Sequence, residues 1–336
     1  MARPTLKDIA DRAGVSMTTV SRALQNKSDI SLPTIERIQK LADEFGYVHN
    51  SVAKSLRSQE TRIVGLLVSD SSNPFYGPVI KGAESTLSKN GYSVILCDTD
   101  ESYQREKDAI DVLLGHRVDG LLITPTQSKN NDISALIAKG VPFVLVGRSF
   151  KDFEVDCVVC DDRRGALAAT EHLLRLGHAN ILLLNAPGYI SSAADRRSGY
   201  EEALRARGLE VDGRLIYECD PTTESAYNTV KRALVEGVVF SALFAFNDIM
   251  LIGALQALKE HGAKVPSEVS MVGFDDLEFL SLLDPPMTSV RIQRYRMGVE
   301  SANLLLSRIK GRKEAQKIIL PAELIIRGST ARMAGS

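Results

Sequence analysis

Short apolar runs rich in β-branched residues alternate with helical patterns from Thr61 onward, and this alternation limits the fold more than any other feature of the chain. Parallel strands need long crossover connections, which amphipathic helices usually supply. The sequence therefore predicts α/β architecture with parallel, doubly wound sheets in two similar lobes. The runs form two series, Ile63–Val68, Ser93–Cys97, Gly120–Ile123 and Phe143–Val146, then Ile181–Leu184, Leu215–Tyr217, Ala242–Ala245 and Val269–Val272.

Three further strand-like pieces surround a helix expected from about residue 295 to 310: Thr288–Ile292, Ile318–Leu320 and Glu323–Ile326. We expect these late pieces to cross between the lobes. The predicted N-lobe covers about residues 61–161 and 293–320, and the predicted C-lobe about 162–291 and 321–336. A hydrophobic content of 44% in 336 residues is enough for sizeable cores in both lobes.

A different pattern occupies the N-terminus, where Thr5 to Leu24 is typical of a helix-turn-helix. Thr5 and Asp8 can form a capping box at the start of a first helix, and Gly14 can end it. Ser16 can then cap a second helix. A third helix, with apolar residues at helical spacing between Ser31 and Gly46, completes an all-α headpiece of residues 1–48.

The second helix leaves Met17, Thr18, Ser21 and Arg22 on its outer face. A short helix that exposes small polar groups and one guanidinium suits a DNA major groove. The alternative is an ordinary helical hairpin without DNA. Residues 1–57 hold nine Lys and Arg against six acidic residues, a mild excess that permits phosphate contacts without proving them.

Residues 49–60 join the headpiece to the lobes, and Asn50–Arg57 within them could form two turns of helix. An isolated helix below about 12 residues is marginal in water. We therefore expect order here only when a partner holds the segment. A plain linker is the alternative interpretation.

Polar and aromatic residues follow the predicted strands of both lobes, where doubly wound sheets bind their ligands. Carboxylates and amides suit hydroxyl groups, guanidinium groups suit anions or ring oxygens, and aromatic rings suit stacking. This set predicts a cleft for a small polar ligand. Its members are Asp70, Ser71, Asn73, Phe75, Tyr76, Asp98, Asp100, Thr124, Thr126, Arg148, Arg196, Phe246, Asn247, Asp248 and Asp275.

Enzyme, redox and membrane signatures are missing from the sequence. No two glycines lie two or four residues apart, which excludes the dinucleotide fingerprint and the nucleophile elbow. Cys157 and Cys160 form a C-x-x-C, but the valines around them imply an extended segment with the two thiols on opposite faces. We therefore predict no catalytic residues, metal site or cofactor. The lack of a signal peptide or a long apolar run predicts a cytoplasmic protein.

With these motifs in place, the chain resembles the LacI/GalR family of bacterial transcription regulators over nearly its full length. The resemblance implies a headpiece joined to a sensor shaped like periplasmic binding proteins. Several motifs carry it in order: Lys7–Ala10, Val15–Ser16, Thr19–Leu24, Asn50–Leu56, Asn73–Tyr76, Arg117–Gly120, Asn247–Asp248, Val272–Asp275 and Arg327–Thr330.

The resemblance also implies a homodimer that binds a pseudo-palindromic, double-stranded operator. Base contacts then belong to Met17, Thr18 and Arg22. Phosphate or positioning contacts belong to Thr5, Ser16, Thr19, Ser21 and Asn26. Residues 50–57 become a hinge helix with DNA contacts at Asn50, Ser51, Ala53, Lys54 and Leu56, and Leu56 wedges into the minor groove. With no leucine heptad at the end of this sequence, we expect a dimer and no tetramer.

In the same way, the resemblance implies an allosteric effector in the cleft between the lobes. Gly147 stands before Arg148 where sugar-binding relatives commonly have aspartate, and Ile292 stands where they often have glutamine. A sugar or sugar derivative is the first expectation, with a phosphorylated sugar, nucleoside or purine left open. The predicted effector contacts are Ser71, Asn73, Phe75, Tyr76, Asp98, Thr124, Arg148, Asp161, Arg196, Phe246, Asn247 and Asp275.

The leading prediction is thus a DNA-binding transcription repressor controlled by a small polar ligand, with induction and co-repression both open. One alternative keeps the regulator but replaces the small ligand with a protein co-repressor. Another is a sugar-binding or sugar-modifying protein without a regulatory role.

Overall fold

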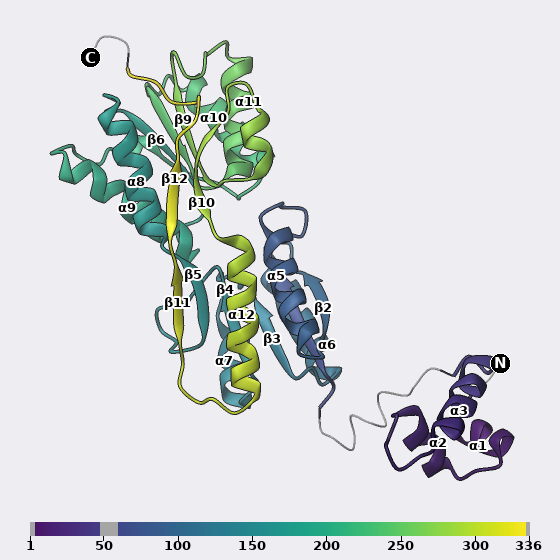
Figure 1. Cartoon of the computed structure of the whole chain (residues 1–336). Helices are drawn as coiled ribbons and strands as arrows, with labels where there is room; N and C mark the ends of the chain where they lie inside the picture. The colour runs from purple at the N-terminus through teal and green to yellow at the C-terminus, as the bar shows by residue number, and fades with distance from the viewer. Residues whose placement is uncertain (1–3, 48–59, 334–336) are drawn as a thin grey trace. The chain divides into compact units, whose positions relative to one another are not determined.

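The computed structural model describes residues 4–47 and 60–333. The chain divides into two compact units, Met1–Thr61 and Arg62–Ser336 (Figure 1). The predicted hinge at residues 50–57 lies outside the described residues.

Residues 4–47 of the first unit form three helices, α1 (Leu6–Ala13), α2 (Met17–Leu24) and α3 (Leu32–Glu44). The predicted capping box is present: the Thr5 amide donates to Asp8 at 2.7 Å and the Asp8 amide donates to Thr5 Oγ1 at 3.4 Å. Gly14, with φ of 65°, ends α1 as predicted, and Ser16 accepts from the Thr19 amide at the start of α2. The three helices share one core, formed by Ile9, Ala10, Ala13, Val20, Ala23, Ile35, Ile38 and Ala42.

The second unit contains two six-stranded sheets, whose strand orders are β11-β5-β4-β3-β1-β2 and β12-β10-β9-β8-β6-β7. We call the first sheet with its helices the N-lobe and the second the C-lobe. The N-lobe elements are β1 (Ile63–Val68), α5 (Tyr76–Lys89), β2 (Ser93–Asp98), α6 (Tyr103–Gly115), β3 (Gly120–Ile123), α7 (Asn131–Lys139), β4 (Phe143–Val146), β5 (Cys157–Cys160), α12 (Arg294–Ile309) and β11 (Lys317–Leu320).

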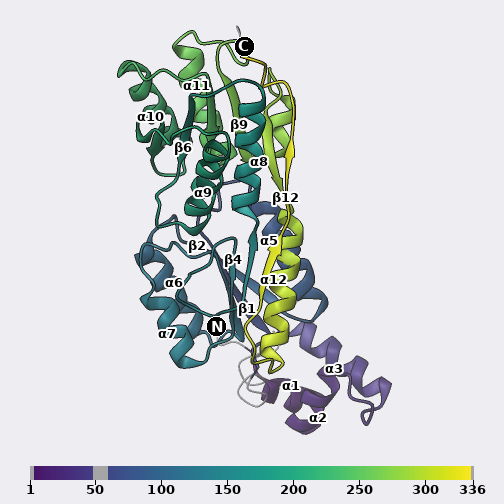
Figure 2. The ribbon, with the colours of Figure 1, turned by 90° about the vertical axis from the view of Figure 1, so that its left-hand side faces the viewer.

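The C-lobe repeats this plan. Its elements are α8 (Asp162–Arg175), β6 (Ile181–Asn185), α9 (Ser191–Ala206), the 3-10 helix η1 (Gly213–Leu215), β7 (Ile216–Glu218), α10 (Thr223–Val235), β8 (Ala242–Ala245), α11 (Asp248–Glu260), β9 (Ser270–Asp275), the 3-10 helix η2 (Glu278–Leu282), β10 (Thr288–Ile292) and β12 (Ala322–Ile325). Leu215, predicted in a strand, lies in η1. The predicted doubly wound architecture is confirmed, with helices on both faces of each sheet (Figure 2).

The chain passes between the lobes three times, after β5, after β10 and after β11. β5 and β11 both leave the N-lobe sheet toward the C-lobe and pair in parallel. β10 leaves the C-lobe whereas β12 enters it, so these two strands pair antiparallel. The pattern of the late strand-like pieces does not fix this direction; β12 is antiparallel because it continues directly from β11 and enters its sheet from the opposite end.

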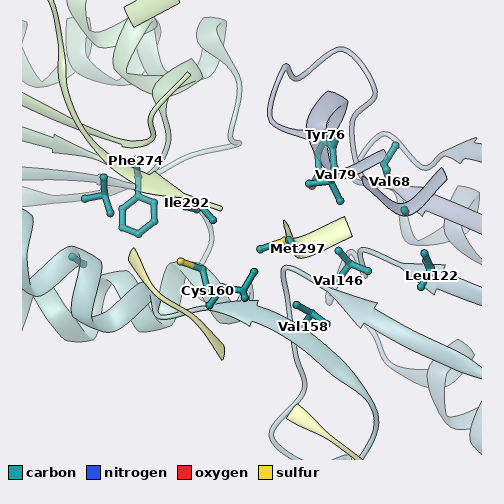
Figure 3. Packing of buried hydrophobic residues seen from close by; sticks show 14 of the residues in the cluster. Val68, Tyr76, Val79, Leu122, Val146, Val158, Cys160, Phe274, Ile292 and Met297 are labelled. Carbon is teal, nitrogen blue, oxygen red and sulfur yellow. The ribbon is translucent and has the colours of Figure 1, made fainter. Parts of the chain in front are cut away.

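One buried apolar cluster belongs to both lobes (Figure 3). Phe274 and Ile292 of the C-lobe sheet belong to it together with Met297 and Cys160 near the crossings. Cys157 instead packs in a separate N-lobe cluster on the other side of the sheet. The two thiols of the C-x-x-C thus face opposite sides of β5, as predicted, and both are free and buried.

Helices α5 and α12 approach so closely that glycine is required on both. A Cβ atom added at Gly82 would overlap the Tyr295 carbonyl oxygen, and one added at Gly298 would overlap the Val79 carbonyl oxygen. Figure 2 shows the two helices side by side. The packing of α12 against α5 holds α5 in place, and α5 begins where the cavity-lining loop after β1 ends.

We predict that Gly82→Ala destabilises the protein by about 3 kcal/mol, because two backbones would have to separate. Urea unfolding of the purified chain measures this change. The control is Gly77→Ala on the same helix, where a Cβ meets nothing within 4 Å and alanine favours the helix. Equal stability of the Gly82 and Gly77 variants would contradict the assignment of close packing.

Candidate functional site

The outer face of α2 presents the residues predicted to read DNA. Met17 is 55% exposed, and Thr18 and Arg22 are also exposed. Arg22 forms an ion pair with Asp29 at 2.6 Å, and the guanidinium lowers the pKa of that carboxyl. An incoming guanine or phosphate would therefore have to compete with Asp29 for the same guanidinium.

The other predicted DNA contacts of the headpiece have local partners. Ser16 and Thr19 share a hydrogen bond at 2.9 Å, and Thr5 belongs to the capping box. Asn26, with φ of 51°, accepts from Gln39 at 2.9 Å. Ser21 accepts a long hydrogen bond from Gln25. The predicted hinge contacts Asn50, Ser51, Ala53, Lys54 and Leu56 lie outside the described residues.

A cavity of about 270 Å³ lies between the lobes, at the carboxyl ends of β1 to β4 and of β6 to β9. Its size is close to the lower end of small-molecule pockets, about 300–1,000 Å³, so it suits a small ligand. The residues lining it are Ser69, Asp70, Asn73, Phe75, Tyr76, Asp100, Glu101, Thr124, Gly147, Arg148, Tyr189, Ile190, Ser192, Arg196, Asp220, Pro221, Thr222, Phe246, Asn247 and Asp275.

Arg196, on α9, is the central cation of the C-lobe wall. Its guanidinium forms a 2.8 Å ion pair with Asp162, donates to the Phe246 carbonyl oxygen and lies 3.7 Å from the Phe274 ring centroid. The residue is 95% buried, since only 5% of its surface is exposed. A buried guanidinium with an ion pair and an aromatic face is held in one orientation.

Asp275, at the end of β9, lines the same wall and is almost fully buried. Its nearest ion-pair partner is Arg196 at 4.0 Å, beyond hydrogen-bond distance. Burial, reinforced by Asp162, raises its pKa to about 7, although Arg196 and Arg294 oppose the shift. A ligand hydroxyl donating to this carboxylate would replace the hydrogen bonds that burial removes.

The N-lobe wall combines aromatic and charged groups. Phe75 and Tyr76 pack edge to face with ring centroids 5.0 Å apart, and the Tyr76 hydroxyl shares a 2.6 Å hydrogen bond with Ser69. Burial raises the pKa of Tyr76 to about 12, so it stays a neutral hydroxyl. Arg148 also lines the cavity and donates two hydrogen bonds to Glu101, at 2.5 and 2.8 Å.

The loop after β3, which carries Thr124, is fixed by a buried carboxyl. Glu106 accepts from the Thr126 amide at 2.7 Å, whereas its other oxygen faces Asp132. Burial and the neighbouring Asp132 raise the pKa of Glu106 to about 9. The group is therefore protonated at neutral pH and can donate to Asp132, both of whose oxygens otherwise find no partner among the described residues.

Direct hydrogen bonds join the lobes at one edge of the cavity. The Gln127 side chain accepts from the Ser191 amide at 2.8 Å and donates to the Ser149 carbonyl oxygen at 2.8 Å. The Ser149 amide also donates to Ser191 Oγ at 3.1 Å. Ser191 begins α9, the helix that carries Arg196, so this edge couples the N-lobe to the cavity's C-lobe wall.

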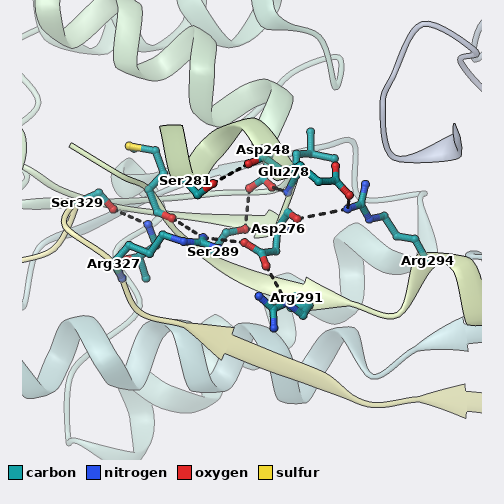
Figure 4. Close-up of polar contacts among 12 residues, drawn as sticks. Asp248, Asp276, Glu278, Ser281, Ser289, Arg291, Arg294, Arg327 and Ser329 are labelled. Carbon is teal, nitrogen blue, oxygen red and sulfur yellow. Dashed lines mark hydrogen bonds and ion pairs between the residues drawn. The ribbon is translucent and has the colours of Figure 1, made fainter. Parts of the chain in front are cut away.

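A charged cluster joins the lobes next to β10 (Figure 4). Arg294, the first residue of α12, donates to the Asp276 carbonyl oxygen at 3.3 Å and to Glu278 at 2.8 Å in the C-lobe. It also donates to the Pro74 carbonyl oxygen of the N-lobe at 3.4 Å. Asp276 in turn pairs with Arg291 and Arg327. Pro74 and Asp276 are direct neighbours of cavity residues.

The predicted cleft residues fall into two groups. Nine of the twelve predicted effector contacts line the cavity: Asn73, Phe75, Tyr76, Thr124, Arg148, Arg196, Phe246, Asn247 and Asp275. Three do not, namely Ser71, Asp98 and Asp161. Ser71 donates to Asp98 within the N-lobe, and Asp161 accepts from the Arg164 amide at the start of α8, so these side chains organise backbone.

Sequence reasoning missed several lining residues, chiefly Glu101 and the loops after β6 and β7. Those loops contribute Tyr189, Ile190, Ser192, Asp220, Pro221 and Thr222. The rule that ligands bind beyond strand ends could have found them, had it been applied to these two strands as well. Asp248, which that rule selected, instead accepts from the Leu277 amide and Ser289 hydroxyl and stabilises the loop after β9.

Two further features, a metal site and a membrane-spanning helix, are absent from the described residues. Within residues 4–47 and 60–333, no group of three or more His, Cys, Asp or Glu side chains is placed to hold a metal ion. No helix in these ranges is long and apolar enough to cross a membrane.

A helix-turn-helix followed by a two-lobed fold with one polar cavity at its strand ends defines a ligand-responsive DNA-binding regulator. Two family models agree with this class: that of bacterial regulatory proteins of the lacI family matches residues 5–50, and that of periplasmic binding proteins and the sugar-binding domain of the LacI family matches residues 61–328. The chain belongs to the LacI family.

Individual relatives cover nearly the whole length of the chain. The HTH-type transcriptional regulator DegA of Bacillus subtilis is 33% identical over 333 residues, which are 98% of each protein. The lac repressor dimer bound to operator and the anti-inducer ONPF has a TM-score of 0.87 at 28% identity, covering 98% of this chain and 100% of that one. The regulator CelR with cellobiose has a TM-score of 0.75 at 32% identity, covering 97% and 100%. These relatives are regulators, which confirms the prediction that the chain is no enzyme.

We predict that Asp29→Asn raises DNA affinity by up to about fivefold, because an exposed ion pair worth at most about 1 kcal/mol no longer competes for Arg22. Fluorescence anisotropy with a labelled duplex at fixed salt measures the change. Asp43→Asn removes the same charge from exposed α3 and is the control. An equal gain from both variants would show only an effect of net charge.

We predict a pH-dependent stability difference between the wild type and Glu106→Gln. The folded chain keeps the Glu106 proton up to about pH 9, whereas the unfolded chain releases it near 4.5. Wild-type stability relative to the variant should therefore fall between these values, by at most about 1.4 kcal/mol per pH unit. Urea unfolding at pH 6 and pH 8.5 measures it, with Glu84→Gln, at a side chain that is 46% exposed, as the control. A difference that does not change with pH would contradict the buried proton.

Proposed function

We propose that this chain is a dimeric, sequence-specific operator-binding repressor whose DNA affinity is controlled by a small, hydroxyl-rich ligand in the cavity between its lobes. The observation that carries the proposal is the convergence of eight strand ends, four from each lobe, on one polar cavity in a chain that begins with a helix-turn-helix. A ligand in this position touches both lobes at once.

DNA recognition is assigned to the exposed face of α2. Met17 and Thr18 would contact base edges, and Arg22 would bind guanine bidentately once released from Asp29. Two copies of this helix suit a pseudo-palindromic operator, because the two-fold symmetry of a dimer matches that of the DNA. The lac repressor, to which the chain is similar, is a dimer on its operator.

The cavity chemistry supports a sugar or sugar derivative as effector. Phe75 and Phe246 offer apolar faces for a ring, and Asn73, Asn247 and Asp275 offer acceptors for hydroxyl groups. Such alternation of flat apolar and polar surface suits a carbohydrate. The similarity to a regulator that binds cellobiose agrees with this class of ligand.

Control of DNA binding would follow from the lobe contacts around the cavity. Gln127 and Ser191 hold one edge, and Arg294 holds the crossing at β10. A ligand that binds both walls favours this arrangement over any in which the lobes separate. Residues 50–57 precede β1 in the chain, so a reoriented N-lobe can change how two headpieces are spaced. Allosteric coupling of this kind is typically worth about 1–3 kcal/mol.

The test begins with selection of duplexes from a random pool, followed by titration of the selected operator at several salt concentrations. We expect a two-fold symmetric site and an affinity that falls steeply with salt. Arg22→Ala should lose about 1–3 kcal/mol of discrimination at one base pair of each half-site. Lys40→Ala, an exposed charge on α3, should keep the discrimination.

Two results would overturn the proposal. Salt-insensitive binding without sequence preference would remove the DNA-reading role. Failure of every sugar and nucleoside in a thermal-shift screen, together with capture of a protein that alters operator affinity, would replace the small effector with a protein co-repressor.

A further inference from the structure

Arg148, the arginine on the N-lobe side of the cavity, is already paired with acceptors from the protein. Arg148 exposes only 7% of its side chain, and both terminal nitrogens donate to Glu101, at 2.8 and 2.5 Å. Its Nη1 also donates to the Pro125 carbonyl oxygen at 2.9 Å. The two terminal nitrogens that would bind a ligand carboxylate or phosphate therefore already have acceptors within the protein.

The loop that carries Glu101 is held in a costly conformation that supports this pairing. Asp100 and Glu101 have φ of 49° and 50°, the left-handed region that non-glycine residues seldom adopt. The Glu101 amide donates to the Ser69 carbonyl oxygen at 2.8 Å, and the Asp100 amide donates to Asp98 at 2.9 Å. Because Glu101 and Arg148 both belong to the N-lobe, their pair does not need the C-lobe to be in place.

The second guanidinium of the cavity is engaged as well. Arg196 pairs with Asp162, donates to the Phe246 carbonyl oxygen and packs against Phe274. An anionic ligand would thus find neither cation free.

Carboxylates outnumber cations in the cavity lining by five to two. Glu101 is one of them and is neutralised by Arg148. Asp100 pairs with Arg105, outside the lining, at 2.7 Å. The other three are not neutralised in this way: Asp70 and Asp220 form no ion pair with any described residue, and Asp275 lies 4.0 Å from its nearest cation. An anion entering the cavity would therefore meet uncompensated negative charge, whereas a hydroxyl or an ammonium group would find acceptors.

We infer that Glu101 is a specificity-determining residue that, by occupying Arg148, reserves the cavity for uncharged or cationic polyhydroxy ligands and excludes phosphorylated and carboxylated ones. The inference rests on the proposed ligand-binding role of the cavity. It removes phosphorylated sugars and nucleotides from the possible effectors and keeps neutral sugars and amino sugars.

The first experiment uses inorganic phosphate as the probe on the full chain. Thermal unfolding is followed in sodium phosphate and in sodium chloride of equal ionic strength, for wild type, Glu101→Gln and Glu101→Gln/Arg148→Gln. We expect a saturable phosphate-specific rise in Tm only in Glu101→Gln, with wild type equal to the double variant. No rise in a folded Glu101→Gln, or a rise in wild type that the double variant lacks, would overturn the inference.

The second experiment needs only the wild type, so it holds even if Glu101→Gln fails to fold. An uncharged sugar that stabilises the protein is compared by calorimetry with its 2-amino and uronic acid counterparts. We expect the uronic acid to bind at least about tenfold more weakly than the neutral sugar, and the amino sugar to retain binding. Equal or tighter binding of the uronic acid would overturn the inference.

These arms separate the inference from the function on which it rests. If no uncharged sugar stabilises the wild type, the proposed sugar effector fails, whereas the phosphate arm still decides whether Glu101 blocks Arg148.

Discussion

A buried arginine holds together the C-lobe half of the ligand cavity. Arg196 connects α9 to Asp162 at the start of α8, to the Phe246 carbonyl oxygen after β8 and to the Phe274 ring within β9. A charge this deeply buried is tolerated only when it is paired and hydrogen-bonded. The positions of Phe246, Asn247 and Asp275 at the cavity wall therefore depend on this one guanidinium.

The N-lobe wall also contains a buried, paired arginine, but here the pairing carboxylate comes from the cavity lining. Arg148 is as buried as Arg196, and the carboxylate is that of Glu101. Both cations thus serve the architecture of the site. Recognition is left to hydroxyl, amide and carboxylate groups and to aromatic faces, which suits a ligand without negative charge.

Much of the fold could be predicted from the sequence because parallel strands are buried on both faces and read as continuous apolar runs. The runs at Gly120–Ile123, Phe143–Val146 and Ala242–Ala245 match observed strands residue for residue. The capping residues Thr5, Asp8 and Ser16 marked the headpiece helices equally well, since capping is a local interaction.

The cavity was less predictable because its partners are distant in the chain. Glu101 and Arg148 are 47 residues apart, and nothing in the local pattern of either indicates the pair. The protonated Glu106 looks like an ordinary exposed helix residue until α7 brings Asp132 against it. Tyr189 and Asp220 lie in the loops after β6 and β7, and the strand-end rule selects these loops without saying which of their residues line the cavity. The direction of β12 likewise depends on which lobe the chain has just left.

In the proposed function, a ligand between the lobes changes how tightly the headpieces bind DNA. The most direct measurement is the affinity for a selected operator, at fixed salt, with and without a saturating uncharged sugar that stabilises the protein. We expect a change of about 5–150-fold in Kd, in either direction. An unchanged Kd while the sugar is demonstrably bound in the cavity would contradict it.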